Sequence, residues 1–137
     1  MALTVLDAGV LIAFLDAEDP HHAAARRALA NAVGRRDDLI LPASAYAELM
    51  VGPHRSGPDV VATAQAALEA LAVQIEPATK AVASAAAELR ARHGRRLRLP
   101  DALVLATALA ARADRVLTTD ARWPKTEVPV EVVEKPK

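Results

Sequence analysis

The candidate catalytic residues of this chain are four acids, Asp7, Glu48, Asp101 and Asp120. Taken singly, each has a structural explanation, because acids cap helix N-termini and favour the first helical turn, and Glu48 could lie on an exposed helix face. Converging carboxylates repel one another, and burial raises some of their pKa values. A divalent cation relieves that repulsion, and Mg²⁺ and Mn²⁺ prefer oxygen ligands. The chemistry that such a site favours is phosphodiester hydrolysis by a metal-activated water.

Alternating strands and helices must position these acids. A buried strand is predicted at residues 3–6, and further strands are predicted at residues 39–41, 73–75 and 115–119, with a last, alternating edge strand at residues 128–133. Helices are predicted at residues 10–15, from Pro20 to Val33, from Ala43 or Ser44 to about Val51, from Gly57-Pro58 to Leu71, from Thr79 to Gly94, and from Pro100 onward. This pattern is typical of a single three-layer α/β/α domain over residues 1–137, with a mainly parallel sheet of four to five strands. Sites in such sheets lie at the carboxyl ends of the strands, and all four acids map to that edge.

Three of the helices carry more detailed expectations. The segment from Ala102 to Ala111 is apolar except for Thr107, which indicates a helix buried on all sides with Asp101 in its first turn. Gly52-Pro53 is expected to end the helix that carries Glu48. The second predicted helix is expected to face the core with Ala23, Leu29, Ala30 and Val33.

Composition narrows the classes of function. Aromatic residues are only 2% of the chain, which argues against a stacking platform for bases. The 17 basic and 17 acidic residues balance, so net charge alone does not indicate a nucleic-acid binder. Thirteen of the basic residues are Arg, the better bidentate phosphate ligand, although a genome rich in Arg codons explains this equally well. The absence of Cys excludes disulfides, thiolate metal sites and Cys nucleophiles. Because no signal peptide or membrane-spanning run is apparent, we expect a cytoplasmic protein.

Four segments together resemble the PIN-domain ribonucleases. They are Leu-Asp7-Ala-Gly-Val-Leu-Ile-Ala, Ala-Tyr-Ala-Glu48-Leu, Leu-Pro-Asp101-Ala-Leu-Val-Leu-Ala-Thr-Ala, and Leu-Thr118-Thr-Asp120. Their order and the chain length match the VapC-type toxins of toxin–antitoxin pairs, and the resemblance covers nearly the whole chain. Each segment alone is weakly specific, whereas four in this order and at these spacings are together fairly specific.

The resemblance implies a parallel sheet in the order 3-2-1-4-5 and an endoribonuclease that depends on Mg²⁺ or Mn²⁺. It also implies a homodimer that a VapB-like antitoxin holds inactive. By residue match, Asp7 and Asp101 are the principal metal ligands, and Glu48 and Asp120 complete the acidic cluster. Thr118 matches a hydroxyl residue that precedes the fourth acid and helps to hold the site.

Gly9 is the main departure from the family pattern. Such proteins often carry Ser or Asn two residues after the first acid, so a hydrogen bond that orients water at the site is in question here. Gly9 also argues against a phosphatase of the haloacid dehalogenase type, which needs a second Asp at that position. A catalytically silent PIN-fold binding module is the alternative from a different functional class, although a silent relative has no reason to keep a repulsive acidic cluster.

An arginine-rich segment immediately precedes Asp101. Its basic residues are Arg90, Arg92, His93, Arg95, Arg96 and Arg98. One hypothesis is that this segment, Arg95, Arg96 and Arg98 in particular, binds RNA phosphates beside the acidic site. A solvated helix C-terminus with arginines that compensate the helix dipole explains the cluster equally well. Trp123, the only Trp, is expected to pack a turn against the core.

Overall fold

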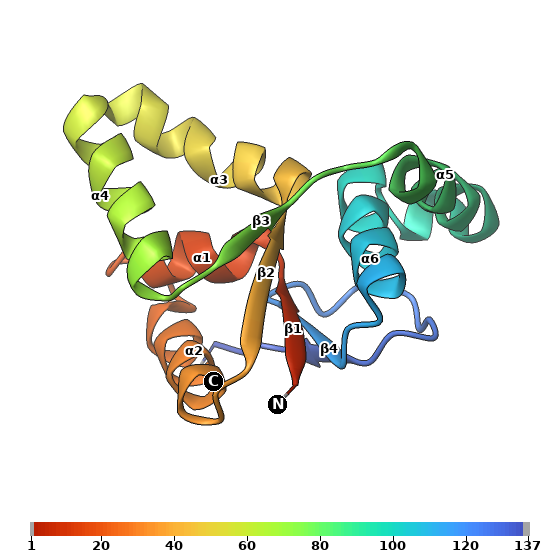
Figure 1. Ribbon diagram of the computed structural model, residues 1–137, viewed down its shortest axis with the longest axis horizontal. Coiled ribbons are helices and arrows are strands. Elements are labelled where there is room, and N and C mark those ends of the chain that lie inside the picture. The colour runs from red at the N-terminus through yellow and green to blue at the C-terminus, as the bar shows by residue number, and fades with distance from the viewer. Residues whose placement is uncertain (1, 136–137) are drawn as a thin grey trace.

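The computed structural model in Figure 1 describes residues 2–135. Over these residues the chain folds into five strands, six α-helices and one 3₁₀-helix. In chain order the elements are β1 (Leu3–Leu6), α1 (Ala8–Leu15), α2 (His22–Gly34), β2 (Asp38–Pro42), α3 (Ala43–Ser56), α4 (Pro58–Ala70), β3 (Gln74–Glu76), α5 (Lys80–His93), the 3₁₀-helix η1 (Gly94–Arg96), α6 (Leu99–Ala111), β4 (Arg115–Thr118) and β5 (Val130–Val132).

The five described strands form one parallel sheet in the order β3-β2-β1-β4-β5. β1 is central, and its Val5 lies opposite Ile40 of β2 and Val116 of β4. In Figure 1, α1, α2 and α4 lie on one side of the strands, and α5 and α6 lie on the other. The predicted α/β fold and strand order are therefore confirmed. Because parallel strands end at one edge of the sheet, the residues that follow β1 and β4 are neighbours there.

The α6 helix is buried almost throughout, as its apolar sequence predicts. It packs against α5 and against β1, β2 and β4. Its most buried side chains are Ala102, Val104, Leu105, Ala106, Thr107 and Ala108. Leu99 and Pro100 occupy the first two helical positions, so Asp101 lies in the first turn as expected. Although α6 is so apolar, no helix within residues 2–135 has the length and hydropathy needed to cross a bilayer.

Two local predictions about the helices are wrong. The helix α3 does not end at Gly52-Pro53 but continues to Ser56, and the Pro53 carbonyl accepts a hydrogen bond from Gly57 at 3.0 Å. The buried face of α2 is also different, because Ala23, Ala30 and Val33 are exposed, although Leu29 is buried as predicted. The side chains of α2 that are buried are Ala24, Ala25, Leu29 and Ala32. An alanine-rich helix has little amphipathic contrast, so its sequence does not define which face is buried.

An ion-pair network joins the amino ends of the strands, opposite the predicted acidic site. Oδ2 of Asp37 accepts hydrogen bonds from Arg35 at 2.9 Å, from Arg115 at 2.9 Å and from Thr4 at 3.2 Å. The Asp37 side chain is only 2% exposed. Burial by itself raises the pKa of this carboxyl, but the hydrogen bonds and the two arginines hold it below its ordinary value. Charge is thus compensated at this edge of the sheet.

Candidate active site

A buried hydroxyl links two of the predicted site acids. Thr118, the last residue of β4, donates from Oγ1 to Oδ2 of Asp7 at 2.8 Å. The same Oγ1 accepts from the backbone N–H of Asp120 at 3.1 Å. Asp7 follows β1 and caps α1, because its Oδ1 accepts from the Ala8 N–H at 2.9 Å. The pairing of β1 with β4 therefore brings Asp7, Thr118 and Asp120 together at the carboxyl edge of the sheet.

Asp101 joins this group from the start of α6. Burial raises the pKa of its carboxyl to about 6, and the negative charges of Asp7 and Asp120 act in the same direction. The pKa of Asp7 is also raised, first by burial and then by the charges of Glu48 and Asp120, although Thr118 and Ala8 oppose the shift. The three aspartates therefore lie within electrostatic reach of one another.

Glu48 lies at the rim of the group, on the exposed surface of α3. Partial burial raises the pKa of its carboxyl, and the charge of Asp101 raises it further. The positive charge of Arg98, which lies just before α6, acts in the opposite direction and lowers the pKa of Glu48. All four acids predicted from the sequence are therefore electrostatically coupled in the folded chain, which sequence reasoning inferred only from strand ends.

Arg122 forms an ion pair at the site that sequence reasoning missed. Asp120 accepts from the Arg122 backbone N–H at 2.8 Å, from Nε at 3.1 Å and from Nη2 at 3.2 Å. These bonds outweigh burial and hold the pKa of Asp120 below its ordinary value. The Arg122 side chain is 86% exposed, so a competing cation or a phosphate could replace either partner at little cost in burial. The only available sequence signal was its position two residues after Asp120.

The donor chemistry of the four acids fits a hard divalent cation, because every candidate ligand is a carboxylate oxygen. Their mutual repulsion is also what a bound cation would relieve. As the side chains stand, however, residues 2–135 hold no group of three or more acidic, His or Cys side chains close enough to share one ion. Asp120 is instead paired with Arg122, and Asp7 is bonded to Thr118. Binding an ion would therefore require side chains to turn toward a common centre.

Thr119 fills the space beside Gly9. A Cβ placed on Gly9 would lie 2.5 Å from Oγ1 of Thr119, closer than real Cβ contacts allow. The hydroxyl of Thr119 thus lies against the first turn of α1, next to Asp7. Glycine at position 9 leaves room for a hydroxyl that comes from the end of β4.

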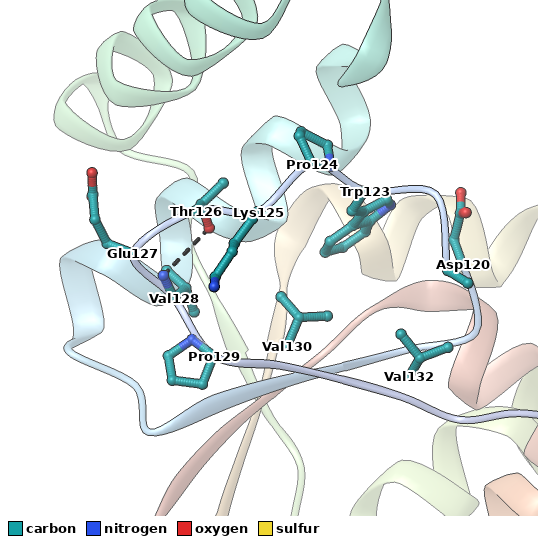
Figure 2. A pocket seen from close by; sticks show the side chains of 11 residues that line it. Asp120, Trp123, Pro124, Lys125, Thr126, Glu127, Val128, Pro129, Val130 and Val132 are labelled. Atoms are coloured by element: carbon teal, nitrogen blue, oxygen red, sulfur yellow. Dashed lines mark hydrogen bonds between the residues drawn. The ribbon is translucent and has the colours of Figure 1, made fainter.

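Trp123 lies on the loop that follows β4, at one end of a cavity of about 450 Å³. Figure 2 shows this cavity with Trp123 and Asp120 on the same loop and with Lys125 and Val130 farther along its wall. The ring packs against the hydrophobic core, as predicted. Its Nε1 atom is buried and lies close enough to Asp101 to lower the pKa of that carboxyl. Sequence reasoning treated Trp123 as a packing residue and missed this second contact.

The arginine-rich segment separates into two parts. Arg92 bonds Glu88 at 3.0 Å, one helical turn earlier on α5, and also lies 3.9 Å from Glu127. Arg95 and Arg96 are exposed on η1. Arg98 lies nearest to the acids, since its charge acts on Glu48, Asp101 and Asp120. The segment thus adjoins the acidic group.

The family model for the PIN domain matches residues 4–129 of this chain. The chain belongs to the PIN domain family. The resemblance on which the strand order and the acidic positions were predicted is therefore confirmed. Among curated protein sequences, none matches this PIN domain.

Solved structures of toxins resemble this PIN domain closely. A toxin–antitoxin complex from Klebsiella pneumoniae superimposes with a TM-score of 0.77 at 22% identity, over 97% of this chain and 99% of the other. VapBC-5 from Mycobacterium tuberculosis, of the VapBC family of toxin–antitoxin systems, gives a TM-score of 0.61 at 28% identity, over 98% and 99%. VapC20 from the same organism is described as a toxin that cleaves the sarcin–ricin loop. It gives a TM-score of 0.67 at 20% identity, over 82% of this chain and 86% of the other. The PIN domain is thus similar in fold to VapC toxins.

We expect Asp101→Asn to raise the melting temperature of the metal-free protein at neutral pH. The pKa of Asp101 is raised from 3.8 to about 6, so its ionised form costs stability in the folded state. That cost is absent below pH 3.8 and grows as the pH rises toward 6. The melting temperatures of the two proteins should therefore converge in acid. Calorimetry in a chelator across this range measures the difference.

Asp59→Asn is the matched control, because Asp59 follows Pro58 in the first turn of α4 as Asp101 follows Pro100 in α6. Asp59 is exposed in that turn, so its loss should lower stability by about 0.3–1 kcal/mol through the helix dipole. Destabilisation by both substitutions would contradict the repulsion at Asp101.

The effect of Gly9→Ala on the free energy of unfolding should depend in sign on the residue at position 119. In the natural sequence the new Cβ meets Oγ1 of Thr119 at 2.5 Å, and such overpacking costs about 1–3 kcal/mol. In a Thr119→Ala background the contact is gone, and Gly9→Ala should stabilise by about 0.5–1 kcal/mol because Ala is the better helix former. Urea unfolding of the four proteins tests this, and the same sign in both backgrounds would refute it.

Proposed function

We propose that the chain is a metal-dependent endoribonuclease and the toxin of a toxin–antitoxin pair, which hydrolyses RNA phosphodiester bonds with a metal-activated water. The observation that carries the proposal is the coupling of four carboxylates at the carboxyl edge of a PIN domain. A cluster of like charges lowers the stability of the fold. A bound cation would relieve the repulsion and would allow the cluster to act on a phosphate substrate. The likeness to VapC20, described as RNA-cleaving, supports RNA as the substrate class.

We assign Mg²⁺ or Mn²⁺ as the cofactor, with Asp7 and Asp101 as the principal ligands and Glu48 and Asp120 completing the set. Such an ion activates water and neutralises charge on the attacking and leaving oxygens. The chain's own part is to hold the acids ionised and oriented. Thr118 does this for Asp7 through its 2.8 Å hydrogen bond.

Arg95, Arg96 and Arg98 are proposed to bind the RNA backbone on the side of the site formed by η1 and the start of α6. Arg95 and Arg96 are exposed and have no acidic partner among the ion pairs of the described residues. Arg98 lies close enough to the acids to lower the pKa values of three of them. Positive charge here would offset the repulsion between RNA phosphates and the carboxylates.

A VapB-like antitoxin is the proposed partner, and the likeness to solved toxin–antitoxin complexes supports it. A hollow of about 420 Å³ lies between α1, α3 and α4, with Glu48 at its border. Ile12 and Val60 in its lining are 40% and 43% exposed. An apolar hollow next to the acidic site is a surface that a partner segment could cover. Homodimerisation and a cytoplasmic location remain predictions from the family resemblance and the sequence.

Purified chain, freed of co-purifying protein, should cleave RNA only when Mg²⁺ or Mn²⁺ is present. Asp101→Asn keeps the shape of the side chain but removes the charge, and it should abolish cleavage. Asp59→Asn is the matched control and should cleave normally, because Asp59 lies in another helix. Gel assays with transfer, ribosomal and messenger RNA measure the activity.

Equal cleavage by wild type and Asp101→Asn would identify a contaminating nuclease. Absence of cleavage, together with no rise in melting temperature in millimolar Mg²⁺ or Mn²⁺, would favour the catalytically silent binding module, since metal that binds the folded state raises that temperature.

Replacing Arg95 and Arg96 together by Ala should weaken RNA binding and flatten its salt dependence. Each lost phosphate contact lowers the slope of log affinity against log salt by about 0.7–0.9. Binding is measured in the Asp101→Asn background, so that the RNA stays intact. The control pair is Arg26 and Arg27, adjacent exposed arginines on α2. An equal slope in both double variants would remove η1 from the RNA interface.

A further inference from the structure

The indole N–H of Trp123 is the single buried polar side-chain atom in residues 2–135 without a hydrogen-bond partner. Leaving a buried donor unsatisfied costs about 1–3 kcal/mol, so native chains seldom keep one without a use. Phenylalanine would fill most of the same space without that cost. The groups that surround this N–H should therefore indicate its role.

The N–H group faces the acidic site from the loop after β4. Trp123 follows Asp120 by three residues, and Figure 2 shows the indole nitrogen on the side of the ring nearer to Asp120. The N–H lies beside the carboxylate of Asp101, close enough to act on it but without a well-formed hydrogen bond. Because Nε1 is closed off from solvent, RNA cannot reach it, and its acceptor must come from the protein.

Asp101 is also the aspartate that most needs a donor. Asp7 accepts hydrogen bonds from Ala8 and Thr118, and Asp120 accepts three from Arg122. Among the described residues, Asp101 has no comparable completed bond, although it is half-buried between the other two acids. An unpaired donor and an under-bonded carboxylate therefore lie next to each other.

We propose that Trp123 is a positioning residue of the site, whose buried N–H completes a hydrogen bond to one oxygen of Asp101 when the other oxygen turns toward a divalent cation. The inference rests on the proposed function, because it assigns Asp101 as a metal ligand. Partners that orient a ligating carboxylate in this way typically alter metal affinity or activity by 10–100-fold when they are removed. Trp123 would thus act through Asp101 and touch neither the metal nor the RNA.

The contact itself is tested without metal. The chain has one Trp, so its ¹H–¹⁵N spectrum contains a single indole N–H resonance. Asp101→Asn should shift that resonance upfield, because a neutral amide polarises the neighbouring N–H less than a carboxylate does. Asp59→Asn, the control in α4, should leave it in place. An unshifted resonance in Asp101→Asn would overturn the inference.

The positioning role is tested with Trp123→Phe, which keeps an aromatic ring and removes the donor. Mn²⁺ affinity, measured by calorimetry, should fall about tenfold, and RNA cleavage should fall in kcat with KM unchanged. The metal-free melting temperature should change little, because the smaller ring loses some packing while the folded state is freed of a buried donor that has no completed hydrogen bond. Tyr46→Phe, which removes an aromatic hydroxyl that contacts Gln65, is the control and should leave Mn²⁺ affinity unchanged.

The outcomes separate the two proposals. If wild type binds Mn²⁺ and Trp123→Phe binds it equally well, the positioning role is overturned while the nuclease proposal stands. If wild type binds no Mn²⁺, the metal-dependent function fails, and the indole resonance alone decides whether Trp123 holds Asp101.

Discussion

Burial of α6 against the centre of the sheet is the constraint on which the acidic site depends. The helix packs on β1 and β4, the two strands that Asp7 and Asp120 follow, so its first turn brings Asp101 to these acids. Each fully buried aliphatic side chain, such as Val104 or Leu105, contributes about 1.5–3 kcal/mol. Several such side chains outweigh the repulsion between carboxylates. The core thus holds like charges together that would separate if they were free.

Groups of the same chain offset that repulsion unequally. Thr118 and the Ala8 N–H stabilise the ionised form of Asp7, and Arg122 pairs with Asp120. Asp101 has only the more distant charge of Arg98 and the unfinished contact with Trp123, and its pKa accordingly reaches about 6. At the opposite edge of the sheet, Asp37 is paired with two arginines and its pKa is lowered. The weaker compensation at the carboxyl edge supports the proposal that a cation binds there.

Most of the fold was predictable because its signals are local. The runs that stop before Asp7 and Asp120 marked two strands, and the apolar run after Asp101 marked the buried helix. The site acids followed from the rule that parallel strands end at one edge. The sequence misled where local rules compete with packing: α3 passes through Pro53, and alanine on every side of α2 hid its buried face.

The sequence by itself determined the residue types, the alternation of strands and helices, and the edge at which the acids gather, because these depend on periodicity and on chain order. Only the tertiary structure decided which side chains from distant parts of the chain meet around the acids. The hydroxyl of Thr119 fills the space over Gly9, and the indole of Trp123 approaches Asp101, although each pair is far apart in the chain. Such contacts arise when buried elements pack at particular distances and angles, and no local pattern of side chains records those distances.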